Sequence, residues 1–167
     1  AMTGQVKLAC TVVEGIQAGQ YDPAEFIQWR KARALAELAS VSAHCNQPEL
    51  AVKCADLAQR LATRLESGRG ILEGDPSPVA LYRGSAMAAV SRAYAEAGQG
   101  KRAQEAAKRA LQELQAFGSM VFEFESGTLR QVIAGSTALQ QALVVLAETG
   151  EYALAQLATD WIVDIWV

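Results

Sequence analysis

Ala89–Leu111, AVSRAYAEAGQGKRAQEAAKRAL, form a pattern of two helical segments joined by a turn, and this pattern occurs three times in the chain. In each copy a turn residue is followed, five positions later, by an alanine, and the copies are spaced 52 residues apart. The three pairs are Asn46 with Ala51, Gly98 with Ala103, and Gly150 with Ala155. A fixed period of this size indicates one supersecondary unit that has been copied and stacked.

Further positions repeat with the same spacing around these pairs. An acidic or amide residue follows each turn residue, and small and large apolar residues precede it. We call each set of equivalent residues in the three copies a column. These columns are Gln47, Gln99 and Glu151; Ala43, Ala95 and Ala147; Ala34, Ala86 and Ala138; and Leu35, Met87 and Leu139. The pattern predicts an all-α protein in which helix hairpins of equal length lie side by side and share a seam of methyl groups.

The composition fits one domain, which we place at residues 2–167. Apolar residues make up 51% of the 167 residues but aromatic residues only 7%, so the interior must consist largely of Ala, Leu and Val. A chain of this length can bury about 70% of its unfolded surface. The formal net charge is −3, with 15 Lys and Arg against 18 Asp and Glu, which provides no basic surface for a nucleic-acid backbone.

The cysteines and the N-terminal segment bear on localisation. Cys10, Cys45 and Cys54 form no CxxC pair, which is typical of reduced thiols in a cytoplasmic protein. The apolar run Leu8–Val13 is interrupted by Glu14 and is too short for a signal peptide or a membrane span. We therefore expect neither a nucleic acid nor a membrane as partner.

Apolar residues spaced by three and four predict about seven helices. The predicted segments are a leading helix at 4–18 and antiparallel hairpins at approximately 22–67, 75–119 and 126–167. Asp22 and Pro23 are typical of a helix start, and Asn46 is expected to end the following helix in the left-handed conformation. Irregular connections are expected at 66–78 and 118–127.

The stretch Ala89–Leu111 resembles the tetratricopeptide-repeat family. The matching residues are Ser91 and Tyr94 on the first helix, Gly98 at the turn, and Ala103, Ala107 and Ala110 on the second helix. Ala39–Ala58 and Leu143–Ile162 are weaker copies, and Arg33–Ala43 is similar to the alanine-rich long variants of bacterial repeat proteins. The resemblance implies an α-solenoid with a right-handed superhelical twist and a role in protein–protein binding.

Two departures separate the chain from that family. Its usual period is about 34 residues, whereas the period here is 52, and the prolines that usually close each unit are missing. The curvature of that family's superhelix therefore cannot be assumed for this chain. Family members that grip a partner's C-terminal carboxylate use lysines and asparagines at positions that are Ala36, Ser40, Ala89, Thr137 and Gln141 here. This disfavours an adaptor for chaperone tails.

In that family the first helix of each hairpin lines the concave groove, and the resemblance therefore implies a set of partner-binding residues. They are Arg30, Arg33, Ser40, Tyr82, Arg92, Thr137, Gln140 and Val144. Trp29 is either a groove anchor or, together with Phe26, part of the core. The expected function is a non-catalytic scaffold that binds a peptide or protein. The alternatives are a regulatory domain that senses a ligand or peptide, and a secretion-chaperone-like protein of similar length.

Five arginines offer a more specific hypothesis about the groove: Arg30, Arg33, Arg83, Arg92 and Arg130. Guanidinium groups bind carboxylates and phosphates bidentately, so together they could receive an acidic or phosphorylated peptide. The alternative is that they are solvated or paired with neighbouring acids such as Glu37 and Glu96.

No motif indicates a reaction, a cofactor or a metal. His44 and Cys45 are adjacent on a helix and point about 100° apart, whereas a nucleophile and its base need side chains in hydrogen-bond reach. The glycines of GRGILEG, residues 68–74, follow no predicted strand, so a phosphate loop is not expected there. Glu123 and Glu125 flank Phe124 without a base or ligand beside them. We therefore expect no enzyme activity.

The end of the chain is unusually apolar because of Trp161, Ile162, Ile165 and Trp166. Terminal units of a helical array normally have a polar outer face. Three arrangements would cover these side chains: a homo-oligomer formed through the C-terminal helix, docking on further sequence, or folding back on the last hairpin. The sequence does not distinguish among them.

Overall fold

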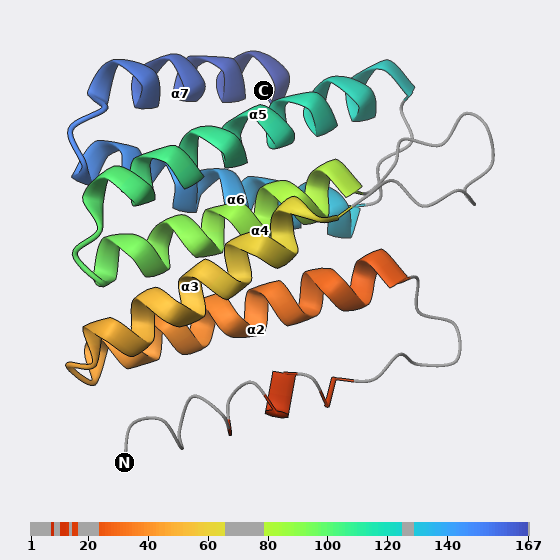
Figure 1. Ribbon diagram of the computed structural model, residues 1–167. Coiled ribbons are helices and arrows are strands. Elements are labelled where there is room, and N and C mark those ends of the chain that lie inside the picture. The colour runs from red at the N-terminus through yellow and green to blue at the C-terminus, as the bar shows by residue number, and fades with distance from the viewer. Residues whose placement is uncertain are drawn as a thin grey trace.

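The computed structural model describes residues 8, 11–13, 15–16, 24–65, 79–124 and 129–166 (Figure 1). Within helices, side chains are described up to residue 117 and again from 134 to 159, with 24 and 25 excepted. The long helices are α2 (Ala24–His44), α3 (Pro48–Thr63), α4 (Val79–Glu96), α5 (Gly100–Phe124), α6 (Leu129–Glu148) and α7 (Tyr152–Trp166). No strand occurs in this described part of the chain, so the predicted all-α class is confirmed there.

The helices pair in chain order. α2 packs on α3, α4 on α5 and α6 on α7, and we call these pairs the first, second and third hairpins. α4 also contacts both helices of the first hairpin, and α6 contacts both helices of the second. Figure 1 shows the result, in which the helices lie side by side with the second hairpin in the middle.

The three turns have the same backbone geometry. Asn46, Gly98 and Gly150 have φ angles of 58°, 73° and 91°, so each has the left-handed conformation. In each turn the next amide donates to the carbonyl five residues back, with N···O distances of 2.9, 2.8 and 2.8 Å. This is the Schellman arrangement that ends a helix. The predicted conformation of Asn46 is confirmed, and the 52-residue period is present in the backbone.

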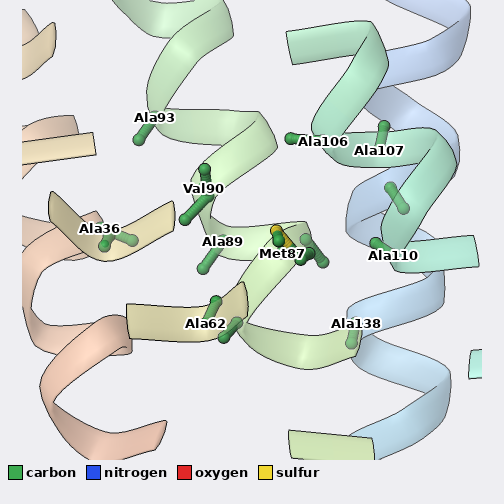
Figure 2. Close-up of a cluster of buried hydrophobic side chains, with 14 of the residues drawn as sticks. Ala36, Ala62, Met87, Ala89, Val90, Ala93, Ala106, Ala107, Ala110 and Ala138 are labelled. Atoms are coloured by element: carbon green, nitrogen blue, oxygen red, sulfur yellow. The ribbon is translucent and has the colours of Figure 1, made fainter. Parts of the chain in front are cut away.

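The repeated apolar columns form the core. Leu35, Met87 and Leu139 are all buried, and Ala51 and Ala103 are fully buried, whereas Ala155 is only partly buried. Figure 2 shows the small side chains around α4, including Ala36 and Ala62 of the first hairpin and Ala106, Ala107 and Ala110 of α5.

Close helix approach is most evident at Gly84. A Cβ added there would lie 2.7 Å from Cγ of Leu114. α4 and α5 are thus too close for a side chain at this position.

The predicted connection at 118–127 is wrong over most of its length. α5 continues through Gly118 to Phe124, five residues beyond the second hairpin boundary predicted at 119. A glycine inside a helix costs only about 1 kcal/mol relative to alanine, and the residues after Gly118 are compatible with a helix. The glycine was therefore too weak a signal to end this helix.

The leading segment occupies a repeat position that was not predicted. Residues 11–13 are helical, and Val13 is buried. Val13 precedes Leu65 by 52 residues, and Leu65 precedes Phe117 by 52; both are buried as well. Val13, Leu65 and Phe117 precede the starts of α2, α4 and α6 by 11, 14 and 12 residues, respectively. Val13 therefore packs beside the first hairpin in the position of the end of a preceding second helix.

Some predictions fall outside the described residues. These are the helix start at Asp22 and Pro23, the connection at 66–78 with its GRGILEG sequence, and the side chains of Arg130, Trp161, Ile162, Ile165 and Trp166. Among the residues that the structure does describe, no helix is both long and apolar enough to cross a membrane.

Candidate functional site

The exposed side shared by α2, α4 and α6 contains the predicted binding residues, and we call it the first-helix face. Two columns of this face repeat in all three hairpins with the 52-residue period: Ser40, Arg92 and Val144, and His44, Glu96 and Glu148. The members of the face are Arg30, Arg33, Glu37, Ser40 and His44 on α2; Tyr82, Arg92 and Glu96 on α4; and Thr137, Gln140, Gln141, Val144 and Glu148 on α6. Residues at this helical spacing lie along one side of a helix.

The contacts between α2 and α4 keep one register along the first-helix face. Phe26 packs against Tyr82 with a centroid distance of 5.8 Å, and the Trp29 indole N–H donates to Oγ of Ser85 at 2.8 Å. Near the other end of the helices, Ser40 donates to Glu96. All three pairs are 56 residues apart in sequence, so α2 and α4 run parallel with a constant offset.

One end of the first-helix face is aromatic and basic. The Trp29 ring stacks on Tyr82 at 5.2 Å between centroids and lies 5.1 Å from Phe26. The guanidinium groups of Arg30 and Arg33 lie 5.9 Å and 5.5 Å from the centroids of Phe26 and Trp29. Trp29 is partly buried, packs against the core and donates a hydrogen bond to Ser85, so the core role predicted for it is present in part. Its role as a groove anchor stays a prediction.

The other end of the face contains a hollow of about 470 Å³ between α4 and α6. It is lined by Arg92, Ala95, Glu96, Gln140, Gln141, Val144, Val145 and Glu148. Val144 is an exposed large hydrophobic residue at this site. The lining therefore combines three apolar side chains, two primary amides, one arginine and two carboxylates.

Glu96 is the centre of the polar contacts beside the hollow. Nε of Arg92 donates to its Oε1 at 2.8 Å, Ser40 donates to its Oε2, and Nδ1 of His44 lies 3.8 Å from Oε2. The hydrogen bond from Arg92 to Glu96, followed by the negative charge of Glu96, raises the pKa of Arg92 above its usual value. Glu96 thus connects the first two hairpins and holds Arg92 at the edge of the hollow.

The structure brings some of the predicted residues together and separates others. Arg92, Gln140 and Val144 line the hollow, and Ser40 adjoins it through Glu96. The remaining predicted residues, Arg30, Arg33, Tyr82 and Thr137, do not line it. Arg30, Arg33 and Tyr82 belong to the aromatic end, and Thr137 is exposed on α6.

Three of the four arginines whose side chains are described, Arg33, Arg83 and Arg92, contact an acid, in contrast to the continuous basic groove of the more specific hypothesis. Arg92 is paired with Glu96, and Nη2 of Arg33 lies 4.0 Å from Glu37. Arg83 points elsewhere: it pairs with Glu113 of α5 at 2.9 Å and donates to the carbonyl of Leu65. These contacts match the alternative that neighbouring acids neutralise the arginines.

Sequence reasoning missed four residues around the hollow: His44, Glu96, Gln141 and Glu148. His44, Glu96 and Glu148 are spaced 52 residues apart, so the repeat itself contained the signal. The sequence indicates Glu96 only as a counter-ion, and Gln141 only as a position where a carboxylate clamp is missing. Their place beside the hollow depends on which polar side chains of different helices come together in the folded structure.

His44, considered above as a base for Cys45, contacts other residues. Nδ1 of His44 lies 2.8 Å from the carbonyl oxygen of Ser40, which can only accept, while Cys45 is exposed. Among the described residues there is no group of three His, Cys, Asp or Glu side chains that could hold a metal ion. The side chains of Glu123 and Glu125 lie outside the described residues.

No family model matches this chain, and comparison with curated proteins and with solved structures also yields no match. The resemblance to tetratricopeptide repeats therefore rests on the residues of Ala89–Leu111 and its two weaker copies. Function has to be argued from the geometry of the first-helix face.

Proposed function

We propose that this chain is a non-catalytic protein-binding module that receives an extended peptide segment on its first-helix face. In this proposal the hairpins continue the tetratricopeptide-like, right-handed solenoid arrangement, and the protein works in the cytoplasm as a scaffold. The observation that carries the proposal is the hollow of about 470 Å³ between α4 and α6. It lies between the first helices of two consecutive hairpins, on the first-helix face.

The chemistry of the hollow suits a peptide backbone. The amides of Gln140 and Gln141 each offer a donor and an acceptor, which a backbone N–H and C=O can satisfy. Val144 supplies an exposed apolar contact beside them. Because Glu96 and Glu148 outnumber Arg92 in the lining, a peptide with a neutral or basic side chain at this point fits better than an acidic one.

Selection from a library of random displayed peptides tests the proposal, because it samples many sequences without assuming a particular partner. Enriched peptides should bind the wild-type chain in calorimetry. Val144→Glu, which places a third carboxylate at the hollow, should weaken binding about tenfold, as expected when a central contact is lost. Gln141→Ala should have a smaller effect in the same direction.

Arg109→Ala is the matched control because Arg109 is exposed on α5, outside the hollow. Its affinity should equal that of the wild type. Failure to enrich any peptide, or binders that respond equally to all three variants, would refute the proposed site.

A ligand-sensing regulatory domain is the second candidate, and the size of the hollow favours it as well. Small-molecule sites usually occupy about 300–1,000 Å³, and the hollow falls within that range. Native mass spectrometry of the purified chain distinguishes the two candidates. A bound small molecule that is lost in Val144→Glu would support the sensor, whereas a chain without added mass that binds selected peptides would support the scaffold.

A further inference from the structure

The outward side of α7 differs from the same side of α3 and α5. At two repeat positions the first two hairpins have exposed charged residues and the third has apolar ones. The two columns are Glu49, Lys101 and Ala153, and Lys53, Glu105 and Leu157. Leu157 is 66% exposed, and Tyr152 at the start of the helix is 70% exposed. A face that is charged in two copies has become apolar in the third.

The equivalent face of α3 lies toward the next hairpin. Pro48, Glu49, Val52 and Lys53 line a hollow together with Gln99, which belongs to the turn of the second hairpin. The corresponding positions in α7 are Tyr152, Ala153, Gln156 and Leu157, and all four are exposed. The apolar residues of α7 are therefore on the side where α3 meets a following hairpin. We call this surface the tail face.

The opposite end of the molecule also has exposed apolar residues. Leu8 and Val12 in the leading segment are 67% and 65% exposed, while Val13 is buried. Beside Val13 is a groove of about 340 Å³ lined by Val13, Lys31, Leu35, Leu57, Arg60, Leu61 and Arg64. Among the described residues of its lining there are three cations and no carboxylate. We call Leu8, Val12 and this groove the head face.

Charge distinguishes between the ways in which two copies could meet. The sequence of α7, YALAQLATDWIVDIW, contains two aspartates and no lysine or arginine. The head face is cationic, so contact between a head and a tail pairs opposite charges, whereas head-to-head or tail-to-tail contact pairs like charges. Juxtaposed like charges oppose association, and complementary ones set its orientation.

We propose that this chain associates with a second copy head to tail, with the tail face of one copy against the head face of the next. Leu157 and Tyr152 bury their apolar surface against Leu8 and Val12, while Arg60 and Arg64 lie near the acidic α7. A contact between two different surfaces is heterologous and can add further copies. The first-helix faces of successive copies would then form one longer binding surface.

Sedimentation velocity of the full chain from about 1 to 300 µM tests the association over the range in which weak complexes form. We expect species larger than a dimer that grow with concentration. Raising the salt from about 0.05 to 0.5 M should reduce their population because it screens the charge pairing. A chain that stays monomeric throughout, or assembly that is indifferent to salt, would overturn the proposal.

Two variants determine the orientation. The head variant is Arg60→Glu with Arg64→Glu, and the tail variant is Tyr152→Ser with Leu157→Lys, in which position 157 takes the residue that α3 has at Lys53. Both change exposed residues, so melting curves should match the wild type and show that the variants fold. Each variant alone should be monomeric, because each lacks one of the two faces.

Mixing the variants is the decisive measurement, since the intact tail of one can meet the intact head of the other. Native mass spectrometry should show a one-to-one heterodimer and nothing larger. Arg109→Glu, on the exposed side of α5, is the control and should assemble like the wild type. Assembly of the head variant alone would indicate tail-to-tail contact and overturn the proposal, as would a mixture that remains monomeric.

Discussion

The junction between the first and second hairpins differs in chemistry from the junction between the second and third. At the first junction, the buried hydroxyl of Tyr94 donates to Asp56 at 2.5 Å, and Arg102 reaches the same carboxylate at 3.0 Å. At the second junction, Leu146 occupies the repeat position of Tyr94 and is also fully buried. Polar contacts there are peripheral: Lys108 pairs with Glu151 at 2.6 Å.

This difference shows that one backbone repeat accepts two kinds of side-chain junction. The turn hydrogen bonds that define the repeat form within each hairpin, so they do not depend on the chemistry between hairpins. The polar junction is directional because a buried hydroxyl must find its acceptor. The apolar junction depends on buried area and close packing instead. Substitutions at equivalent positions should therefore have different consequences.

The largest effect is expected at the apolar junction. Leu146→Ala removes a fully buried side chain and leaves a cavity between the second and third hairpins, which should lower the free energy of unfolding by about 2–5 kcal/mol. Urea denaturation followed by circular dichroism measures this loss. The exposed Val41→Ala is the control, with an expected change near zero. Equal losses for both would mean that the second junction is not a packed interface.

An intermediate effect is expected from enlarging the alanine that follows each turn. Ala103 is fully buried in the middle hairpin, so Ala103→Leu should overfill its site and cost about 1–3 kcal/mol. Ala155 has the same repeat position in the terminal hairpin but is only partly buried, and Ala155→Leu should cost less. Thermal melts of the two variants provide the comparison, and an unchanged melting curve for Ala103→Leu would contradict the assigned repeat.

The smallest effect at neutral pH is expected at the polar junction. Tyr94→Phe keeps the ring and removes the hydroxyl, and Asp56 keeps its bond with Arg102, so the loss should be about 0.5–1.5 kcal/mol. Chemical denaturation at pH 7 measures it. A loss as large as that of Leu146→Ala would show that the hydroxyl contributes as much as the apolar packing.

The same tyrosine should make stability depend on alkaline pH. Burial, followed by the hydrogen bond to Asp56, raises the pKa of Tyr94 above its usual value of 10.0. The folded state thus holds this proton more tightly than the unfolded chain. The resulting stability is present in full below about pH 10 and is lost as the pH rises from there through the folded pKa. Wild type should therefore lose more stability than Tyr94→Phe between pH 8 and about 11.

Local features were the part of the fold that sequence reasoning predicted correctly. Asn46, Gly98 and Gly150 were identified because a left-handed residue at a helix end is a strong and local signal. The end of α5 was missed because Gly118 is a weak breaker inside a long helix. The repeat position of Val13 was missed because the leading segment shows only part of a hairpin.

The candidate site was only partly predictable for a related reason. Arg92, Gln140 and Val144 were found because the resemblance to tetratricopeptide repeats implies that the first helix of each hairpin lines a groove. The period alone would not have found Gln140, because Ala36 and Ala88 at the equivalent positions are buried. The role of Glu96 as the acceptor for Arg92 and Ser40 was not foreseen. It depends on the offset of 56 residues between α2 and α4, which only the packing of the two helices sets.

The amino-acid sequence by itself determined the helices, the three turns and the 52-residue period, because each arises from hydrogen bonds and apolar spacing within a few turns of chain. Only the tertiary structure decided which arginines are neutralised, where the hollow forms and which apolar residues stay exposed at the two ends. Those properties depend on distances between side chains from different helices. Close packing of small residues sets these distances to within a fraction of an ångström.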